Sequence, residues 1–256
     1  MNLIKKQDFF LLEEVIRKNF SSKYKDSILG IVWSVLNPLL SVIVLTIVFS
    51  TLLGRGIENY PVYLLSGRCV FAYFAGTVGA SMNIIKSNQN VLKRTSAPKY
   101  VFVIGTIISE FLNFIISFIL LIIIMIVTNA PFHPSFMILS IIPIISLLIL
   151  VTGSSLIMSI LATYYTDIKH LWSIITQLLL YSSAIFYSMD TIPEPYHQYL
   201  ILNPVFWAID QFRAFMIIGT FPDMLNMVNL FLLSLIILIL GIIIFEKYEN
   251  KVIMKL

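Results

Sequence analysis

The sequence predicts an all-α integral membrane protein with six transmembrane helices, and three observations support this fold class. Of the 256 residues, 59% are hydrophobic and only 12% are charged, whereas a soluble domain is roughly 45–50% apolar and about 25% charged. Long stretches contain no Asp, Glu, Lys or Arg, the longest being residues 111–166. The basic residues gather in alternate connecting segments. We therefore treat residues 1–256 as a single transmembrane domain.

Residues 1–26 are expected to form a cytoplasmic amphipathic helix in the membrane interface. Phe9, Leu12, Ile16 and Phe20 recur at helical spacing, and charged residues occupy the opposite face. Such a helix typically lies in the plane of the interface. The segment is too charged for the apolar region of a cleavable signal peptide. The alternative is an ordinary helix packed against another part of the protein.

The charge-poor stretches supply six candidate spans, since a spanning helix needs about 20 largely apolar residues. The expected spans are residues 28–53, 61–85, 100–128, 135–163, 170–189 and 224–245. The sequence NAPFHP, residues 129–134, marks the turn that divides the longest apolar stretch. An even number of spans places both termini on one side.

The distribution of basic residues predicts which side that is. All but three of the 17 Lys and Arg residues fall before span one, after spans two and four, or in the C-terminal tail. The exceptions are Arg55, Arg68 and Arg213. By the positive-inside rule, both termini are cytoplasmic in an inner or plasma membrane. The net charge of +4 is thus a topology signal and does not indicate nucleic-acid binding.

Residues 190–223 predict a re-entrant hairpin on the outer side, which we interpret as a gate. Two apolar pieces, each too short to span, are separated by Asn203-Pro204 and by residues 210–213. Irregular backbone at membrane depth is tolerated where protein buries it or where it lines a water-filled path. We therefore expect this segment to line or cap a conduit. A surface-lying amphipathic loop is the alternative.

The triplet Leu-Asn-Pro occurs twice, at residues 36–38 and 202–204. Proline removes a backbone donor, and asparagine offers a replacement polar group. The triplets therefore predict two places where a helix is bent or broken. One lies in span one and the other in the outer segment.

Glu110 is the one acid near the middle of a predicted span. It lies ten residues into span three, about 15 Å from Tyr100 at 1.5 Å per residue. Ionisable groups at this depth are costly and often functional. Either Glu110 acts in a pathway or in coupling, or it is a helix-contact carboxyl satisfied by neighbours such as Ser109 and Asn113. We favour the second interpretation.

Aromatic residues cluster in the predicted outer halves of the spans. An interfacial belt is the default interpretation of such a cluster. A sugar channel also uses aromatic faces, so the same residues are secondary candidates for substrate contact. The channel and gate candidates are Tyr63, Phe71, Tyr73, Phe74, Tyr181, Phe186, Tyr187, Asn203, Pro204, Trp207 and Arg213.

The cytoplasmic loop at residues 84–99 is short, basic and polar, with two apolar residues among its charges. It predicts a small helix that docks on a soluble partner. The candidate coupling residues are Lys86, Asn88, Val91, Leu92, Lys93 and Arg94.

Motifs for bound nucleotides and metals are absent from the sequence. It contains no G-x-x-x-x-G-K-[ST] phosphate loop, no H-E-x-x-H and no Cys/His cluster. Its single cysteine, Cys69, excludes an internal disulfide framework and makes a thiolate metal site improbable. We expect no catalytic residues and no cofactor in this chain.

Four stretches resemble one family. Residues 23–40 carry a Tyr-Lys-x-Ser-x-Leu-Gly-x-x-Trp run that ends in Asn-Pro, and residues 164–196 carry Asp-Ile-x-His and a later Ile-Phe-Tyr. Residues 199–217 and 81–100 complete the set. These resemble the opening, the fifth span, the outer gate and the coupling loop of the membrane subunits of type-2 ABC exporters for polysaccharides, O-antigen and teichoic acids. The span-one residues in the family motif are Tyr24, Gly30, Trp33, Asn37 and Pro38.

The resemblance implies a permease that forms a homodimer and works with two copies of a separate ATPase. That partner would bind ATP and Mg, and the cargo would be a lipid-linked glycan. The lipid headgroup is anionic, so Lys23, Lys25 and Arg68 are candidates to attract it. The chain departs from the family at Arg68-Cys69-Val70, where an apolar-Pro-Trp run is usual, and at Ala97-Pro98-Lys99, where a Pro-Arg pair is usual.

Three other functions compete with glycan export. A type-2 exporter of drugs or small lipids shares the six spans, but the span-five and gate motifs favour glycan. A secondary transporter normally shows internal repeats and several buried ionisable residues. A membrane enzyme acting on lipid-linked sugars needs convergent acids, bases or metal ligands.

Overall fold

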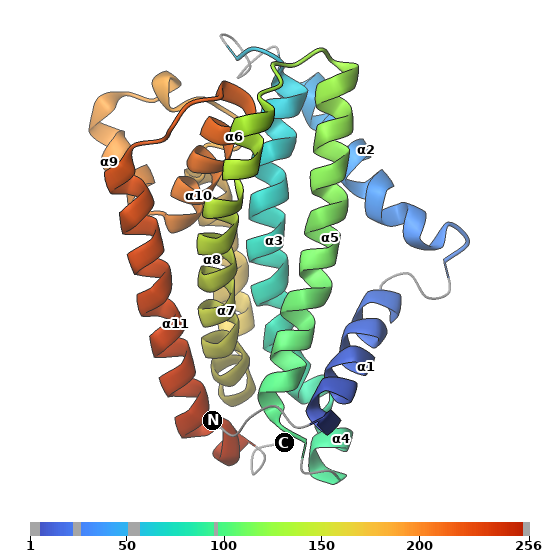
Figure 1. Ribbon diagram of the computed structural model, residues 1–256. Helices are drawn as coiled ribbons and strands as arrows, with labels where there is room; N and C mark the ends of the chain where they lie inside the picture. The colour runs from blue at the N-terminus through green and yellow to red at the C-terminus, as the bar shows by residue number, and fades with distance from the viewer. Residues whose placement is uncertain (1–5, 23–26, 51–56, 95–96, 253–256) are drawn as a thin grey trace.

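The structure is a computed structural model that describes residues 6–22, 27–50, 57–94 and 97–252. All regular secondary structure within those ranges is helical, which confirms the predicted all-α class. The long helices run side by side, and the short ones gather at the two ends of the bundle (Figure 1).

Four helical segments are long and apolar enough to cross a membrane. They are α3 (Tyr60–Ser87), α5 (Lys99–Val127), the pair α6 (Pro134–Leu139) and α7 (Ile141–Tyr164), and α11 (Met224–Val252). They correspond to predicted spans two, three, four and six. Helix α11 continues to Val252, seven residues beyond the predicted end of span six.

The predicted count of six spans is not confirmed by helix length. Helix α2 (Trp33–Phe49) has 17 residues and α8 (Ile168–Ser182) has 15. At 1.5 Å per residue these are about 25 and 22 Å long, short of a hydrocarbon core of about 30 Å. The last residues of predicted span one, 51–53, lie outside the described ranges. Helix α8 ends at Ser182, well before the predicted residue 189.

The segment predicted to lie on the outer side is helical but sharply bent. Two short 3₁₀ turns (Met189–Thr191 and Glu194–Tyr196) precede α9 (His197–Ile201), and α10 (Pro204–Arg213) continues into a π-helical turn, Ala214–Ile218. The two arms on either side of Asn203 meet at 101°. If they count as one broken span, the described helices supply five. The predicted break at Asn203-Pro204 is therefore confirmed.

Helix α2 behaves differently at the other Leu-Asn-Pro triplet. The helix is not broken at Pro38, since it runs from Trp33 to Phe49 as one element, and the predicted bend there stays a prediction. Proline inside a helix removes one i→i−4 hydrogen bond, here the bond to the Ser34 carbonyl. The sequence offers no distinction between the two triplets, because the difference lies in the tertiary partners of Asn203.

Helix α3 is the centre of the bundle. It contacts α5, α7, α10, α2 and α8, and most of its side chains are buried, including Leu64, Leu65 and Val78. In Figure 1 it stands between α5 and the α7–α8 pair. Elements that are far apart in the sequence therefore meet on its surface.

Helices α7 and α11 cross at a pair of glycines. A Cβ on Gly153 would lie 2.6 Å from the backbone carbon of Ile237, and one on Gly241 would lie 2.6 Å from the Gly153 carbonyl oxygen. Small residues let helix backbones approach closely in membranes, where packing rather than hydrophobicity drives association. This pair therefore sets the closest approach of the two helices.

Side-chain hydrogen bonds tie both ends of the bundle. At one end, Lys99 Nζ donates to Asn250 Oδ1 at 3.1 Å and joins the start of α5 to the end of α11. At the opposite end, Asn59 Nδ2 donates to Thr128 Oγ1 at 2.7 Å and joins the start of α3 to the end of α5. Helix α1 (Lys6–Ser22) and α4 (Gln89–Arg94) lie at the first of these ends (Figure 1).

Candidate functional site: a bent outer segment, a polar pocket and a coupling end

The backbone leaves the helical conformation directly after α8. Residues 183–188 form an irregular connection, and Ala184 has φ of +47°. The carbonyl groups of this connection accept hydrogen bonds from tyrosines on α3. The Tyr60 hydroxyl donates to Phe186 O at 2.8 Å, and the Tyr63 hydroxyl donates to Tyr187 O at 2.7 Å and to Ala184 O at 3.2 Å. The irregular backbone is thus satisfied by protein, as membrane depth requires.

Arg213, at the end of α10, donates to the same connection from the other side. Its guanidinium is buried, with 6% of the residue exposed. Nη1 donates to Ala184 O at 2.8 Å, and Nη2 donates to Ile185 O at 3.2 Å and to Tyr63 O at 3.0 Å. Nε donates to Ser66 Oγ at 3.2 Å. The predicted gate residue Arg213 therefore holds backbone of α3 and of the connection, and it points into the protein.

Asn203 fixes the bend between α9 and α10. Its Oδ1 accepts from the backbone N–H of Val205 at 2.9 Å, which caps α10. Its Nδ2 donates to Ser182 Oγ at 2.9 Å and to Ser183 Oγ at 2.8 Å. One buried side chain thus ends α8 and begins α10. The predicted role of asparagine as the replacement polar group is confirmed at this triplet.

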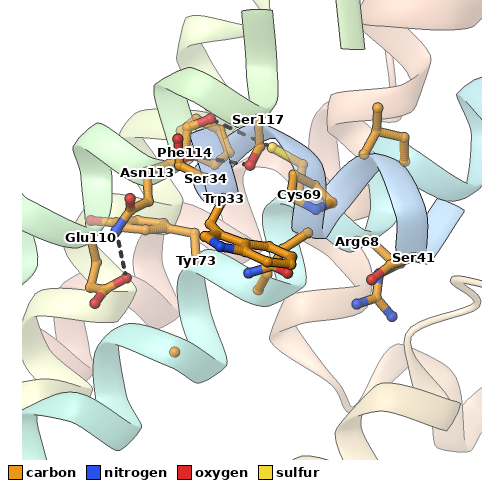
Figure 2. A pocket seen from close by; sticks show the side chains of 15 residues that line it. Trp33, Ser34, Ser41, Arg68, Cys69, Tyr73, Glu110, Asn113, Phe114 and Ser117 are labelled. Carbon is orange, nitrogen blue, oxygen red and sulfur yellow. Dashed lines mark hydrogen bonds between the residues drawn. The ribbon is translucent and has the colours of Figure 1, made fainter. Parts of the chain in front are cut away.

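A polar pocket of about 300 Å³ lies between α2, α3 and α5. Its aromatic lining comes from Trp33, Tyr73 and Phe114 (Figure 2). Its remaining polar lining comes from Ser34, Asn37, Ser41, Arg68, Glu110, Asn113 and Ser117. Polar side chains from three helices at this depth are expensive in a membrane and usually functional.

Glu110 and Arg68 occupy opposite ends of this pocket (Figure 2). Asn113 Nδ2 donates to Glu110 Oε2 at 3.3 Å, so the predicted neighbour does satisfy the acid. Glu110 is partly exposed to the pocket and not sealed between helices. Neither of the two interpretations of Glu110 is therefore excluded.

At the opposite end of the bundle from the bent segment, α1 packs on α5 and bonds Asn88, the residue before α4. Val15 of α1 is buried against Gly105, whose Cβ would come within 2.5 Å of Val15 Cγ1. Lys18 Nζ donates to Asn88 Oδ1 at 3.1 Å, and Asn19 Nδ2 donates to Thr106 Oγ1 at 3.2 Å. The N-terminal helix is therefore packed against the protein, as the alternative interpretation expected, while Phe9 and Phe10 stay exposed.

Comparison with known proteins identifies the family. The model of the ABC-2 type transporter family matches residues 11–217, most of the chain.

The chain belongs to the ABC-2 type transporter family.

Curated relatives of this ABC-2 transporter match it nearly end to end. The O-antigen export system permease protein RfbA of Klebsiella pneumoniae is 28% identical over 245 residues, covering 95% of this chain and 93% of the relative. The RfbA permease of Myxococcus xanthus is 22% identical, covering 94% and 93%. The polysialic acid transport protein KpsM of Escherichia coli is 22% identical over 241 residues, covering 93% of each.

Most of the aromatic residues that the sequence offered as channel candidates of this ABC-2 transporter pack inside the chain. Tyr73 contacts Phe111 and Phe114, and Phe74 contacts Trp172. The buried channel candidates are Phe71, Tyr73, Phe74, Phe186, Asn203 and Arg213, and the partly buried ones are Tyr63, Tyr187, Pro204 and Trp207. Tyr181 is 56% exposed and keeps an open aromatic face. The other candidates pack against neighbouring side chains or form hydrogen bonds with the backbone of this chain.

The predicted coupling helix of the ABC-2 transporter exists as α4. Two of its candidates, Asn88 and Leu92, are buried toward α1 and the bundle. The exposed candidates are Lys86, Val91, Lys93 and Arg94. Two residues of the predicted segment thus pack against the rest of the protein, and the other four lie at the surface.

The span-one motif is described only in part. Lys23, Tyr24 and Lys25 lie outside the described residues. Gly30 has φ of +50°, a left-handed conformation that glycine adopts without strain, and it starts the 3₁₀ turn before α2. Trp33, Asn37 and Pro38 all line the polar pocket.

Sequence reasoning missed several residues that the geometry brings forward. Tyr60 and Ser66 bind the bent segment from more than 100 residues away. Lys18 and Ser41 were not singled out either. The polar lining from Ser34 and Ser117 had only one signal, a polar residue inside an otherwise apolar span.

Proposed function

We propose that this chain is the membrane-spanning subunit of an ATP-driven exporter that moves a lipid-linked polysaccharide across the cytoplasmic membrane. The observation that carries the proposal is the end-to-end match to O-antigen and polysialic acid permeases, over 93–95% of this chain. The bent, internally satisfied segment after α8 supports a gate at the outer side. The chain itself performs transport and has no enzymatic role in this proposal.

The working unit is a homodimer whose conduit runs between two copies of α8. Helix α8 has no buried residue, and it exposes His170, Ser173 and Gln177 at i, i+3 and i+7. These three lie on one helix face, in line with the exposed ring of Tyr181. Polar groups on an exposed face favour a conduit over lipid contact. Helix α2, with only Ser34 and Val42 buried, offers a second surface for the partner copy.

Energy comes from a separate ATPase, two copies of which dock on the end that carries α4. The exposed basic residues of α4 and the anchored helix α1 form the receiving surface. Six crossings, made by α2, α3, α5, α6–α7, α8 and α11, place both termini on that cytoplasmic side, in agreement with the basic-residue distribution. The segment at residues 190–223 then lies outside.

The test is reconstitution with a separate ABC ATPase from the same organism. Purified permease alone should hydrolyse no ATP, and the complex in proteoliposomes should move a lipid-linked glycan only when ATP is supplied. A variant that tests the conduit, Gln177→Leu on the exposed face of α8, should retain assembly but lose transport. Hydrolysis by the permease alone, or transport limited to drugs or small lipids, would contradict the proposal.

A further inference from the structure

The polar pocket continues into an apolar groove along α2. The groove is lined by Leu40, Val44 and Leu45, together with Ser41 and Arg68. Ser41 and Arg68 also line the polar pocket, so the two hollows meet at these side chains. The combined cavity therefore has an apolar arm, a cationic junction and a hydroxyl-rich arm.

Arg68 has no counterion at this junction. Within the part of the chain that the structure describes, it forms no ion pair and no hydrogen bond, and it is only partly exposed. It lies eight residues into α3, and helical side chains lean toward the N-terminal end. A cation inside a span is normally paired or placed where it meets a functional partner. Residues 6–22, 27–50, 57–94 and 97–252 therefore supply no anion for Arg68, which fits a cation that meets an external one.

The hydroxyl-rich arm contains a second unsatisfied group. The side chain of Tyr73 is 97% buried, with 3% exposed, and its hydroxyl has no hydrogen-bond partner in the described structure. Burying a hydroxyl without a partner costs about 1–3 kcal/mol. Trp33 offers an indole face in the same arm, beside the Asn113–Glu110 pair (Figure 2). An aromatic face beside amide, carboxylate and hydroxyl groups matches the mixed apolar and polar surface of a sugar ring.

We propose that this cavity binds the glycosyl-phosphate end of the lipid-linked glycan. The phosphoryl group meets Arg68 and Ser41, the first sugar occupies the arm between Trp33 and Tyr73, and the lipid chain lies along Leu40, Val44 and Leu45. This inference rests on the proposed export function and names the part of the cargo that the chain recognises. The volume of about 300 Å³ lies at the lower limit of ligand pockets, which suits a single sugar.

Gly76 provides a variant that fills the sugar arm without disturbing the fold. It lines the pocket, and a Cβ built there would meet no atom within 4 Å. Leucine and alanine both have higher helix propensity than glycine. Gly76→Leu should therefore block the arm, and Gly76→Ala should leave most of it open.

The experiment measures binding to the permease alone, in phosphatidylcholine nanodiscs, by isothermal titration calorimetry. The probes are a prenyl phosphoryl glucose, a prenyl phosphate and a prenyl glucoside without phosphate. Arg68→Gln should weaken the two phosphate probes about tenfold or more and leave the glucoside unchanged. Gly76→Leu should lower the affinity for prenyl phosphoryl glucose to that for prenyl phosphate. Gly76→Ala should lower this affinity less than Gly76→Leu does, and Lys247→Gln, a change at an exposed lysine of α11, is the control and should bind as wild type.

Three results would overturn the inference. Equal binding of the phosphate probes to wild type and Arg68→Gln would show that Arg68 does not bind the phosphate. If Gly76→Leu kept the wild-type difference in affinity between prenyl phosphoryl glucose and prenyl phosphate, the sugar would not bind in this arm. Complete displacement of the probe by phosphatidylglycerol at equal mole fraction would show a general site for membrane phospholipid.

Failure of the site and failure of the export function can be told apart. Transport of a lipid-linked glycan with unaltered probe binding in both variants would reject the site and keep the function. Variant-sensitive binding of prenyl phosphoryl glucose, without ATP-driven glycan transport by the wild-type complex, would keep the site and reject the function.

Discussion

The guanidinium of Arg213 lies 3.5 Å from the centre of the Tyr63 ring, while its Nη2 donates to the Tyr63 backbone carbonyl at 3.0 Å. The Tyr63 hydroxyl and Arg213 Nη1 also both donate to the carbonyl of Ala184. Two residues 150 positions apart thus hold one turn of irregular backbone between them. This arrangement holds the outer segment in place. The carbonyls of Ala184, Ile185 and Tyr187 have no other partner among the described residues.

Replacing Tyr63 by Phe keeps the ring under Arg213 but removes the donor to Ala184 and Tyr187. We expect the free energy of unfolding to fall by about 1–3 kcal/mol, the cost of leaving the Tyr187 carbonyl unpaired, since the Ala184 carbonyl keeps its bond from Arg213. Arg213→Lys should cost more, since lysine lacks the planar fork that reaches several carbonyls at once. Chemical unfolding in detergent, followed by circular dichroism, measures both. Tyr181→Phe, at an exposed ring, is the control, and a loss there equal to that of Tyr63→Phe would contradict this account.

Asn203→Ala should destabilise the protein more than Pro204→Ala or Pro38→Ala. Alanine at 203 removes the cap of α10, worth about 0.5–2 kcal/mol, and also the bonds to Ser182 and Ser183. Pro38→Ala restores a backbone donor inside a continuous helix and should be neutral or stabilising. Midpoints of thermal unfolding for the three variants rank them. A ranking with Pro38→Ala as the most harmful would show that α2 needs its proline for folding.

Lys18→Met should uncouple ATP hydrolysis from transport without unfolding the protein. The bond from Lys18 to Asn88 is a single, partly exposed hydrogen bond, so its loss should cost about 0.5–1.5 kcal/mol of stability. It nevertheless joins α1 to the segment that leads into α4. We expect normal assembly and ATPase rates with reduced export per ATP in proteoliposomes. Arg17→Met, one position earlier on an exposed face, should leave this ratio unchanged.

Gly153→Ala should separate α7 from α11. The added methyl group would lie 2.6 Å from backbone atoms of Ile237, a distance that side-chain rotation cannot relieve. Overpacking of this kind typically costs about 1–3 kcal/mol. The midpoint of thermal unfolding should therefore fall. The comparison variant is Gly76→Ala, where the same methyl group enters open space, and an equal fall in both would refute the role of the crossing.

Cysteine labelling checks the proposed orientation. The single native cysteine, Cys69, is buried and should not react with a membrane-impermeant maleimide. In intact cells, Glu194→Cys in the bent segment should react, and Lys93→Cys on α4 should react only after lysis. Labelling of Lys93→Cys in intact cells would invert the proposed topology.

The long helices were predictable from sequence, because their apolar runs exceed the thickness of a membrane. The Leu-Asn-Pro triplet predicted the break at Asn203-Pro204 but also allowed one at Asn37-Pro38, where the helix is continuous. The end of α8 was not predictable, since it depends on donors from Tyr63 and Arg213, distant in the chain, that replace the helical bonds of residues 183–188. The same limit explains why Phe71 and Phe74 were offered as channel residues. Their burial is decided by helix neighbours that the sequence does not name.

The sequence indicated some of the residues that line the pocket, but not that they line the same one. Arg68 and Glu110 stood out as charges inside spans, and each was assigned a separate role. That they line one cavity depends on how α3 and α5 are placed side by side. Trp33, Asn37 and Pro38, noted only as a motif, line that cavity as well.

Helix α3 begins at Tyr60, which binds the irregular outer backbone, and ends at Ser87, next to the asparagine that receives Lys18. Its 28 residues run without interruption, over about 42 Å. A rod of this kind transmits an axial push or a tilt from one face of the membrane to the other with little loss. One continuous helix therefore joins the bent segment to the end of the bundle that carries α1 and α4, so a tilt of α3 would move both.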